Sequence, residues 1–226
     1  LSQGFADWLL FIVADDGRDY EAVLANAGLS DPRFRFLDTG VVGGGASRAR
    51  NLALDRIDTA HAAILDADDR FKPQKLTRAV AALADHAIVT SALDVMDERF
   101  RHLRHVGAGP NWVLAPGEHK FVSFSMDSML VWDRRRCDGR YDSELSNMTD
   151  LEFLMQLYRT APRSFHLGEP LHDYVKRSAS MSNGPGVTET MIASKTVLLQ
   201  RLARGDYPMA DAAGPAGIAA FLEISL

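Results

Sequence analysis

The chain has 226 residues, of which 46% are hydrophobic and 24% charged, so it can bury a full core and has neither a collagen-like nor a disordered composition. Lys and Arg number 25 against 30 Asp and Glu, and the net charge of −5 argues against a nucleic-acid partner, because phosphate neutralisation needs a basic face. The single cysteine, Cys137, rules out an internal disulfide. We therefore expect an ordinary globular chain from a reducing compartment, the cytoplasm.

Strands and helices are predicted to alternate through the first half of the chain. Residues 8–14 form an uninterrupted apolar run, WLLFIVA, and the turn signal Asp15-Asp16-Gly17 follows, which predicts a strand buried on both faces. The other elements predicted here are helices at 20–27, 46–57 and from Pro73 to 83, and strands at 33–37, 62–65 and 87–91. This alternation predicts an α/β fold with a mostly parallel sheet flanked by helices.

The second half has a weaker pattern. Residues 91–118 are polar and interrupted by Gly and Pro, which predicts loops and at most a hairpin. The elements predicted after them are a strand at 123–132, a turn at 134–141, helices at 150–159 and 187–202, and a loosely attached helix within 210–226. Because there is neither an internal repeat nor a clear linker, one domain is the simplest interpretation.

Two carboxylates follow the short buried strand at 62–65. Asp66 and Asp68 are two residues apart, so in an extended chain they point to the same side. The carboxyl ends of parallel strands are where open α/β sheets bind ligands, and all-oxygen ligands suit Mg²⁺ or Mn²⁺. The alternative is a solvated acidic turn that caps the next helix, and the pair alone does not decide between the two.

Asp15 and Asp16 also follow a buried strand. Adjacent parallel strands would place both acidic clusters along one edge of the sheet. The three glycines at 43–45, directly before a predicted helix, would let a backbone approach a nucleotide closely. Because this run matches neither G-x-G-x-x-G nor a Walker P-loop, by itself it predicts only a flexible turn.

Several short motifs follow one another in a fixed order. They are Asp15-Asp16-Gly17, GGASRARN at 44–51, ILDADDRFKPQKL at 64–76, MDSMLVWDRRRCDGRY at 126–141, TDLEFLMQLYR at 149–159 and YVKRSASMS at 174–182. The ordered set over residues 5–182 resembles the family 2 glycosyltransferases of GT-A fold, although each motif alone is weak.

The resemblance implies a GT-A domain at residues 1–182, with a smaller acceptor-side region, and a C-terminal helical extension at 183–226 packed on the same domain. It also implies that residues 1–8, LSQGFADW, correspond to the stretch just after the family's first strand. The first β-α unit is therefore expected to be missing from the chain.

The activity implied by the resemblance is a metal-dependent inverting transfer of a sugar from a UDP- or GDP-sugar to an acceptor hydroxyl, in cell-surface polysaccharide or glycoconjugate synthesis. The acceptor would be a glycan, a lipid-linked molecule or a small molecule, and peripheral association with the inner face of the membrane is part of this expectation. The cofactor would be Mn²⁺ or Mg²⁺, a Lewis acid that neutralises charge on the leaving nucleotide diphosphate.

Site residues follow from the resemblance position by position. Those assigned to the nucleotide sugar are Asp15, Asp16, Gly44, Arg50, Asp66 and Arg177. Asp68, together with Asp66, would hold the metal. Asp150 matches the general base that takes the acceptor proton, and a position that opens a helix favours its anionic form. Taken alone, Asp150 would be an ordinary carboxylate at a helix N-terminus.

Three residues depart from the family pattern: Arg18 replaces a Ser, Thr149 replaces the Glu before the base, and Arg177 replaces a His that helps to hold metal or diphosphate. An arginine can pair with phosphate directly. Because of these departures, a non-catalytic family member that binds a nucleotide sugar or glycan is a first alternative. A nucleotidyltransferase of related fold is a second alternative, although its Gly-rich basic loop is not visible. Arg70 argues against a dehalogenase-type phosphatase, which needs Thr or Val there.

Other polar features give weaker predictions. His102 and His105 lie in a polar region without an evident helix, which argues against a metal-binding pair. The three arginines at 134–136 predict a solvated turn rather than a site for an anionic acceptor, and Cys137 is predicted to be structural.

Overall fold

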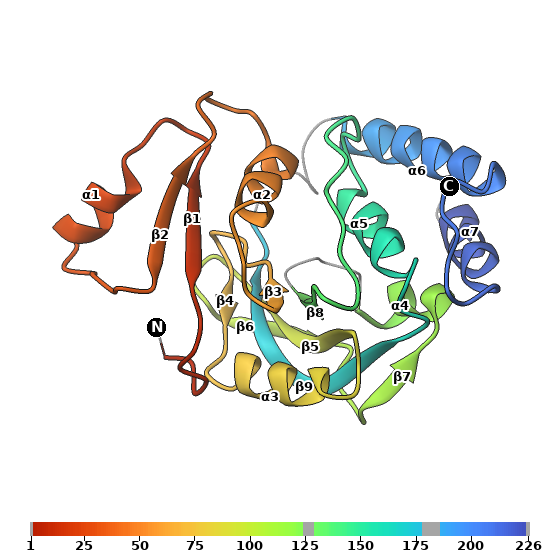
Figure 1. Ribbon diagram of the computed structural model, residues 1–226, viewed down its shortest axis with the longest axis horizontal. Coiled ribbons are helices and arrows are strands. Elements are labelled where there is room, and N and C mark those ends of the chain that lie inside the picture. Colours follow the sequence, from red (N-terminus) through yellow and green to blue (C-terminus); the bar gives the residue numbers. More distant parts are fainter. Residues whose placement is uncertain (1, 124–128, 178–185, 225–226) are drawn as a thin grey trace.

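The computed structural model of the protein describes residues 2–123, 129–177 and 186–224. Its helices are α1 (Tyr20–Asn26), α2 (Ala46–Leu54), α3 (Lys75–Leu83), α4 (Pro116–Ser123), α5 (Thr149–Leu157), α6 (Val187–Ala203) and α7 (Gly214–Ile224). Its strands are β1 (Leu10–Ala14), β2 (Phe34–Asp38), β3 (His61–Ala63), β4 (Arg70–Phe71), β5 (Ile88–Met96), β6 (His102–Val106), β7 (Trp112–Leu114), β8 (Val131–Asp133) and β9 (Ser164–Val175). Strands run through the centre, with α3 on one side and α5 on the other (Figure 1).

The strands form two separate sheets. The larger has seven strands in the order β3-β8-β5-β9-β4, with β6 added to β5 and β7 added to β9. The smaller consists of β1 and β2 alone, and it lies with α1 at the opposite end of the molecule from α6 and α7 (Figure 1). The predicted α/β class and the helices flanking a central sheet are confirmed.

The strand directions differ from the mostly parallel sheet that the sequence predicts. Parallel pairing joins β1 to β2 and β5 to β9, whereas the other described pairs are antiparallel. The reason is that β8 is inserted between β3 and β5 and pairs antiparallel with both. Alternation of strands and helices sets the direction of β3 and β5 relative to each other, but it does not show that a later strand separates them.

The small sheet corrects a second prediction. Residues 8–14 are predicted to be buried on both faces, but four of the five residues of β1 are only half-buried and Ala14 alone is buried. Among the described strands β1 pairs with β2 only, and the described residues of α1 include none that is buried. An apolar strand with one strand neighbour and a thinly packed helix stays partly exposed.

The main core lies between the large sheet and α5. Phe153 of α5 stacks on Tyr141 with ring centroids 4.5 Å apart and meets Trp132 of β8 edge-on at 5.1 Å. Leu151, Leu154 and other residues of α5 are buried in the same cluster. Packing on both faces of this helix fixes its N-terminus, which carries Asp150.

The C-terminal part is more firmly attached than its Ala- and Gly-rich sequence predicts. A Cβ atom at Gly117 of α4 would lie 2.7 Å from the Cα of Gly217, so α4 and α7 are in backbone contact. Ile218 and Leu222 of α7 are buried in the main core. Small residues allow this close approach, and the amino-acid composition alone does not predict the contact. The domain boundary predicted at residues 182 and 183 lies outside the described residues.

One strand prediction also needs correction, and one long strand is missed. Among the described residues, the strand predicted at 123–132 is present only as β8, and α4 extends to Ser123; residues 124–128 lie outside the described chain. The longest strand, β9, has no sequence prediction, since Gly168 and Pro170 interrupt its pattern. The hairpin allowed within 91–118 is present as β5 and β6. The described helices include none that is both long and apolar enough to cross a membrane.

Candidate active site

The carboxylate of Asp15, at the end of β1, organises the glycine run. Its Oδ1 accepts hydrogen bonds from Thr39 Oγ1 (2.8 Å) and from the backbone N–H of Gly44 (3.0 Å), and its Oδ2 accepts one from the N–H of Gly45 (2.8 Å). The hydrogen bonds from Gly45 and Thr39 hold the pKa of Asp15 below its usual value. Asp15 therefore shapes the loop that begins α2.

Gly44 has no room for a side chain. A Cβ atom there would lie 2.9 Å from Arg48 Cδ, 2.9 Å from Val41 Cγ2 and 3.0 Å from the Oδ1 of Asp15. A surface groove of about 540 Å³ runs beside it. The groove is lined by Asp38, Thr39, Gly44, Arg48, Asn51, Leu52, Asp55 and Ser143. Gly44 is the one predicted site residue among these lining residues.

Asp16 is exposed and bonded locally. Its carboxylate accepts hydrogen bonds from the N–H of Arg18 (3.1 Å) and from Tyr20 Oη (2.9 Å), and Arg18 Nε lies 3.5 Å away. The hydrogen bond from the N–H of Arg18 is the main reason that the pKa of Asp16 lies below its usual value. The backbone N–H at position 18 thus supports the acidic turn, and the Arg18 side chain adds a nearby positive charge.

Asp66 and Arg50 form an ion pair between the β3–β4 turn and α2. Arg50 Nη2 lies 2.6 Å from Asp66 Oδ1, and the guanidinium sits 5.2 Å from the ring centroid of Tyr141. Both side chains are partly exposed, at 18% for Arg50 and 33% for Asp66. The predicted pair of donor-site residues is therefore brought together, with Arg50 holding Asp66 in position.

The two remaining aspartates of this turn have different surroundings. Asp69 is buried: its Oδ2 lies 2.8 Å from His172 Nε2, and its Oδ1 accepts the N–H of Val175 at 2.9 Å. These bonds tie the turn to β9. Asp68 is half-buried and makes no hydrogen bond or ion pair with any other described residue. The two aspartates therefore have different roles. Asp69 anchors the turn, and the carboxylate of Asp68 could accept a cation.

The end of β9 lies against the same turn. Burial raises the pKa of Tyr174, and the negative charges of Asp69, Asp68 and Asp66 raise it further, so all three carboxylates are within electrostatic range of its phenol. This concentration of negative charge fits a divalent cation, whose preferred ligands are carboxylate oxygens. The observation supports Asp68, with Asp66, as the residues that would hold Mn²⁺ or Mg²⁺.

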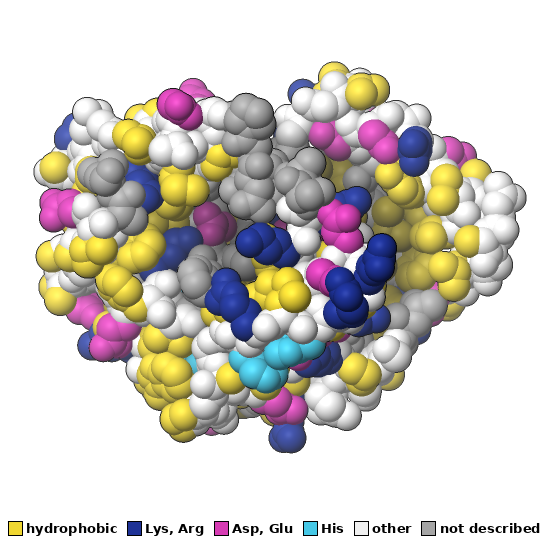
Figure 2. Space-filling view, turned by 180° about the vertical axis from the view of Figure 1, so that it is seen from behind, with side chains coloured by type: hydrophobic (Ala, Val, Ile, Leu, Met, Phe, Trp, Pro, Cys, Tyr) yellow, Lys and Arg dark blue, Asp and Glu magenta, His cyan; other side chains and the backbone are white. Residues whose placement is uncertain are grey.

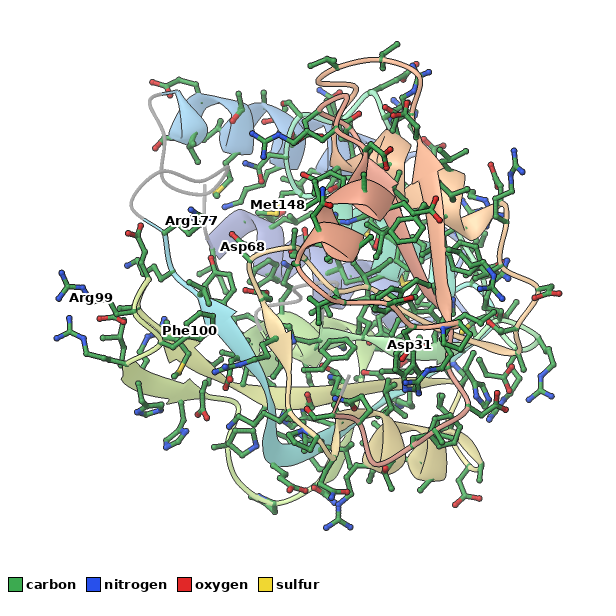
Figure 3. The ribbon with its side chains drawn as sticks, turned by 90° about the vertical axis from the view of Figure 1, so that its left-hand side faces the viewer. Asp31, Asp68, Arg99, Phe100, Met148 and Arg177 are labelled. Carbon is green, nitrogen blue, oxygen red and sulfur yellow. The ribbon has the colours of Figure 1, made fainter. Side chains whose placement is uncertain are left out.

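Arg177 follows β9 and is exposed. The N–H of the preceding Lys176 donates to the carbonyl of Met96 (2.9 Å), which keeps this segment beside the end of β5. In Figure 3, Arg177, Asp68 and Met148 come from three different segments and lie toward the same part of the molecule. The rest of the predicted closing motif, residues 178–182, lies outside the described chain.

Asp150 lies in the first turn of α5, after Met148 in a left-handed conformation with φ of 60°. Asp150 Oδ2 is 3.0 Å from Nζ of Lys120 on α4, and the Lys120 side chain is only 9% exposed. A non-glycine residue at positive φ is uncommon and is often found beside a functional site. The pairing with Lys120, which the sequence does not predict, orients the carboxylate proposed as base.

Two of the weaker sequence features, the arginines at 134–136 and Cys137, have structural contacts in the described chain. Arg134 Nη1 donates to the carbonyl of Ile57 (2.6 Å), and Arg135 pairs with Asp133 (2.9 Å), so this segment is the predicted exposed turn, anchored through Arg134. Cys137 is buried, and burial raises its pKa to about 12, which confirms a structural thiol.

Comparison with known proteins gives both a family and a fold. The family model "Glycosyl transferase family 2" matches residues 2–160. Comparison with curated proteins by sequence found no match. Two similar solved structures are those of S. aureus TarS 1–349, both 16% identical to the chain and matching over 98% of it: the UDP-GlcNAc complex has a TM-score of 0.73, and the UDP complex has one of 0.68.

The chain spans 65% of the TarS chain in the first of these structures and 64% in the second, and at this identity the likeness establishes the fold alone. The family match rests on sequence and covers well over half of the chain, from before β1 to the end of α5. It agrees with a central sheet flanked by helices and with the order of acidic motifs. The chain belongs to glycosyl transferase family 2.

Proposed function

We propose that this protein transfers a sugar from a UDP- or GDP-sugar to an acceptor hydroxyl, with inversion and with dependence on Mn²⁺ or Mg²⁺. The observation that carries the proposal is the β3–β4 turn, where Asp66 is held by Arg50, Asp69 is buried against His172, and Asp68 is left without a described partner. The UDP-GlcNAc and UDP bound by TarS of similar fold support a nucleotide-sugar donor.

On this proposal each described residue has a separate task. Asp15 holds the loop of Gly44 and Gly45 in the shape that the donor's nucleotide would meet, and Asp16 lies at the same turn. A divalent cation held by Asp68 and Asp66 would neutralise charge on the leaving diphosphate. Arg177 would add a guanidinium that can bind phosphate oxygens in a bidentate way.

Asp150 would act as general base. Its carboxylate is ordered by Lys120 and lies in the first turn of α5, where the helix dipole favours the anion. In an inverting transfer it would take the proton of the acceptor hydroxyl while that oxygen attacks the anomeric carbon from the face opposite the leaving diphosphate. The acceptor, whether a glycan, a lipid-linked molecule or a small molecule, belongs to this proposal and is expected in cell-surface polymer synthesis.

A donor screen with three variants tests the assignment. UDP- and GDP-sugars are supplied with Mn²⁺ or Mg²⁺, and release of the nucleoside diphosphate and product stereochemistry are measured. Asp150→Asn should lower turnover about 10²–10⁴-fold while UDP binding by calorimetry is retained. Asp68→Ala should remove the metal dependence of both binding and turnover. Asp58→Ala removes an exposed carboxylate elsewhere and should change neither.

The outcomes separate the alternatives. Turnover unchanged in both Asp68→Ala and Asp150→Asn would refute the site assignment. Binding of a nucleotide sugar without transfer to any acceptor or to water would identify a non-catalytic member. Release of pyrophosphate from a nucleoside triphosphate and sugar phosphate would identify a nucleotidyltransferase.

A further inference from the structure

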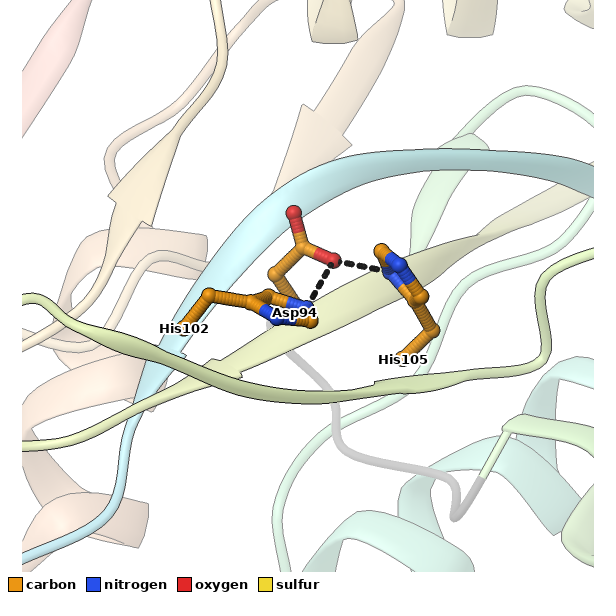
Figure 4. A group of neighbouring side chains, drawn as sticks. All are labelled: Asp94, His102 and His105. Atoms are coloured by element: carbon orange, nitrogen blue, oxygen red, sulfur yellow. Dashed lines mark hydrogen bonds and ion pairs between the residues drawn. The ribbon is translucent and has the colours of Figure 1, made fainter.

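A second group of metal-ligating side chains lies on the β5–β6 hairpin. His105 Nδ1 is 2.5 Å from Asp94 Oδ1, and His102 Nε2 is 3.2 Å from the same oxygen (Figure 4). The two imidazole rings are 4.4 Å apart between centroids. Both histidines are exposed, with 43% and 58% of their side chains accessible, whereas Asp94 is buried beneath them.

A β-bulge brings these histidines to one face. Asp94 pairs with His105 and Val95 with Arg104, but Met96 pairs with His102, so Leu103 is an extra residue on β6. In a regular strand, residues three apart point to opposite faces. The bulge restores a common face for His102 and His105, with Asp94 directly opposite. The two histidines therefore meet on one face although no helix brings them together, which is the ground on which the sequence argues against a metal-binding pair.

Charge around Asp94 leaves one carboxylate oxygen for the histidines. Lys72 Nζ is hydrogen-bonded to Asp94 Oδ2 and lies 3.6 Å from Asp173 Oδ1, while Arg70 pairs with Asp173 at 2.9 Å. The ammonium therefore fixes the far oxygen and orients Oδ1 toward the imidazoles. Outer contacts of this kind tune the affinity of metal ligands.

We propose that Asp94, His102 and His105 bind a first-row transition-metal dication, with Zn²⁺ as the reference ion, at a site separate from Asp66 and Asp68. Two imidazole nitrogens and one carboxylate oxygen suit Zn²⁺, Co²⁺ or Ni²⁺ rather than Mg²⁺, and solvent would complete the coordination. The site does not depend on the proposed sugar transfer.

The geometry needs only a small adjustment. Zn–N and Zn–O distances near 2 Å in a tetrahedral site separate ligand atoms by roughly 3.3 Å. His102 Nε2 already lies 3.2 Å from Asp94 Oδ1, and the three ligand atoms all lie within 4.8 Å of one another. His105 Nδ1 must retreat by about 1 Å, which its exposed side chain permits by rotation. Its Nδ1 must present a lone pair, so its ring proton resides on Nε2 in the bound state.

The surface around the site favours coordination over simple charge attraction. Histidine side chains are visible on the face drawn in Figure 2, with Lys and Arg side chains on the same face. Arg101 and Arg104, next to the two histidines in sequence, are exposed. A hard cation held by charge alone would be repelled by these groups, whereas imidazole coordination gives a transition metal a directional bond.

Calorimetric titration of the whole chain with Zn²⁺, without nucleotide, tests the site, and Co²⁺ absorption in the visible reports its geometry. We expect one ion to bind the natural chain and at least tenfold weaker binding in His102→Ala and His105→Ala. Lys72→Met, which removes the group behind Asp94, should weaken binding by about 10–100-fold. His61→Ala, which removes a half-buried histidine elsewhere, should bind Zn²⁺ like the natural chain.

Thermal unfolding provides a second readout, because an ion that binds only the folded state raises the midpoint. Zn²⁺ should raise the midpoint of the natural chain and of Asp68→Ala, but not of His105→Ala. Absence of Zn²⁺ binding in the natural chain, or binding that persists unchanged in both histidine variants, would overturn the proposal. Because Asp68→Ala removes the proposed donor-site cation and leaves the hairpin intact, the two proposals fail independently.

Discussion

Strands β1 and β5 differ in burial, and the difference is the opposite of what their sequences predict. β1 is uninterruptedly apolar, yet only one of its five residues is buried. β5 contains Thr90, Ser91 and Asp94, yet all nine of its residues are buried. The difference lies in their neighbours: β5 pairs with β6, β8 and β9, whereas β1 pairs with β2 alone among the described strands. The burial of a strand depends on the elements that pack against it. A hydrophobic sequence permits burial but does not produce it.

The largest expected effect of this difference is on unfolding free energy. Phe153 is fully buried between Tyr141 and Trp132, so Phe153→Ala should lower the unfolding free energy by about 3–5 kcal/mol. Phe11 of β1 is half-buried, and Phe11→Ala should cost less than half as much. Urea denaturation of both variants measures the ratio, and equal losses would contradict the contrast between the two sheets.

The sequence predicts which residues form the candidate site but not which residues hold them in place. The order of acidic motifs identifies the β3–β4 turn and the start of α5, because each motif is local. It does not identify Lys120 as the partner of Asp150 or His172 as the partner of Asp69, since these contacts join residues 30 and 103 positions apart. Strand β9 is missed for a related reason: three strand neighbours pair with it, despite Gly168 and Pro170.

Acid should destabilise the large sheet before the small one. Burial, and then the charges of Lys120 and His166, lower the pKa of His119 to about 3, against about 6.5 in an unfolded chain. Between these values the unfolded chain binds more protons, so unfolding free energy should fall by about 1.4 kcal/mol for each pH unit below 6.5. The unfolding free energy at pH 4.5 should thus be about 2 kcal/mol lower than at pH 6.5 because of this group.

His119→Gln is the matched variant, because Tyr158 Oη and Ser164 Oγ remain bonded to each other at 2.9 Å. It should lose most of this pH dependence. Asp15 and Asp16 of the small sheet have pKa values below the usual one, so their contribution is lost only at lower pH. Burial raises the pKa of Glu152, which acts in the opposite sense. An unchanged slope in His119→Gln would refute the assignment.

Base should strengthen the large sheet through Lys75. Burial lowers the pKa of this lysine to about 7, although its Nζ donates to Ser91 Oγ and to the carbonyl of Met129, both at 2.8 Å. From pH 7 to about 10 the unfolded chain holds the extra proton, so unfolding free energy should rise with pH. From pH 7.5 to 9.0 the gain is about 2 kcal/mol.

Lys75→Met replaces the amine by an apolar group of similar length and removes its titration. The variant should lose this rise from pH 7.5 to 9.0, so the stability difference between it and the natural chain must change with pH. A parallel response of the two proteins would show that Lys75 is not the titrating group. Substitutions in β1 should leave the slope unaltered, since Lys75 packs against β5 and Phe71 instead.

The smallest effect on stability is expected in the small sheet, where the predicted donor loop lies. In Gly44→Ala the new methyl group would meet Arg48, Val41 and the Oδ1 of Asp15 at 2.9–3.0 Å, so the N–H groups of the loop must move away from that carboxylate. We expect a loss of about 1 kcal/mol or less in unfolding free energy, but about tenfold weaker UDP binding by calorimetry. Gly40→Ala is the control: its φ of 75° strains an alanine, but nothing lies within 4 Å of the added atom. Weaker UDP binding in Gly44→Ala alone would place the donor at the loop held by Asp15, whereas equal weakening in both would assign the loss to general loosening of the small sheet.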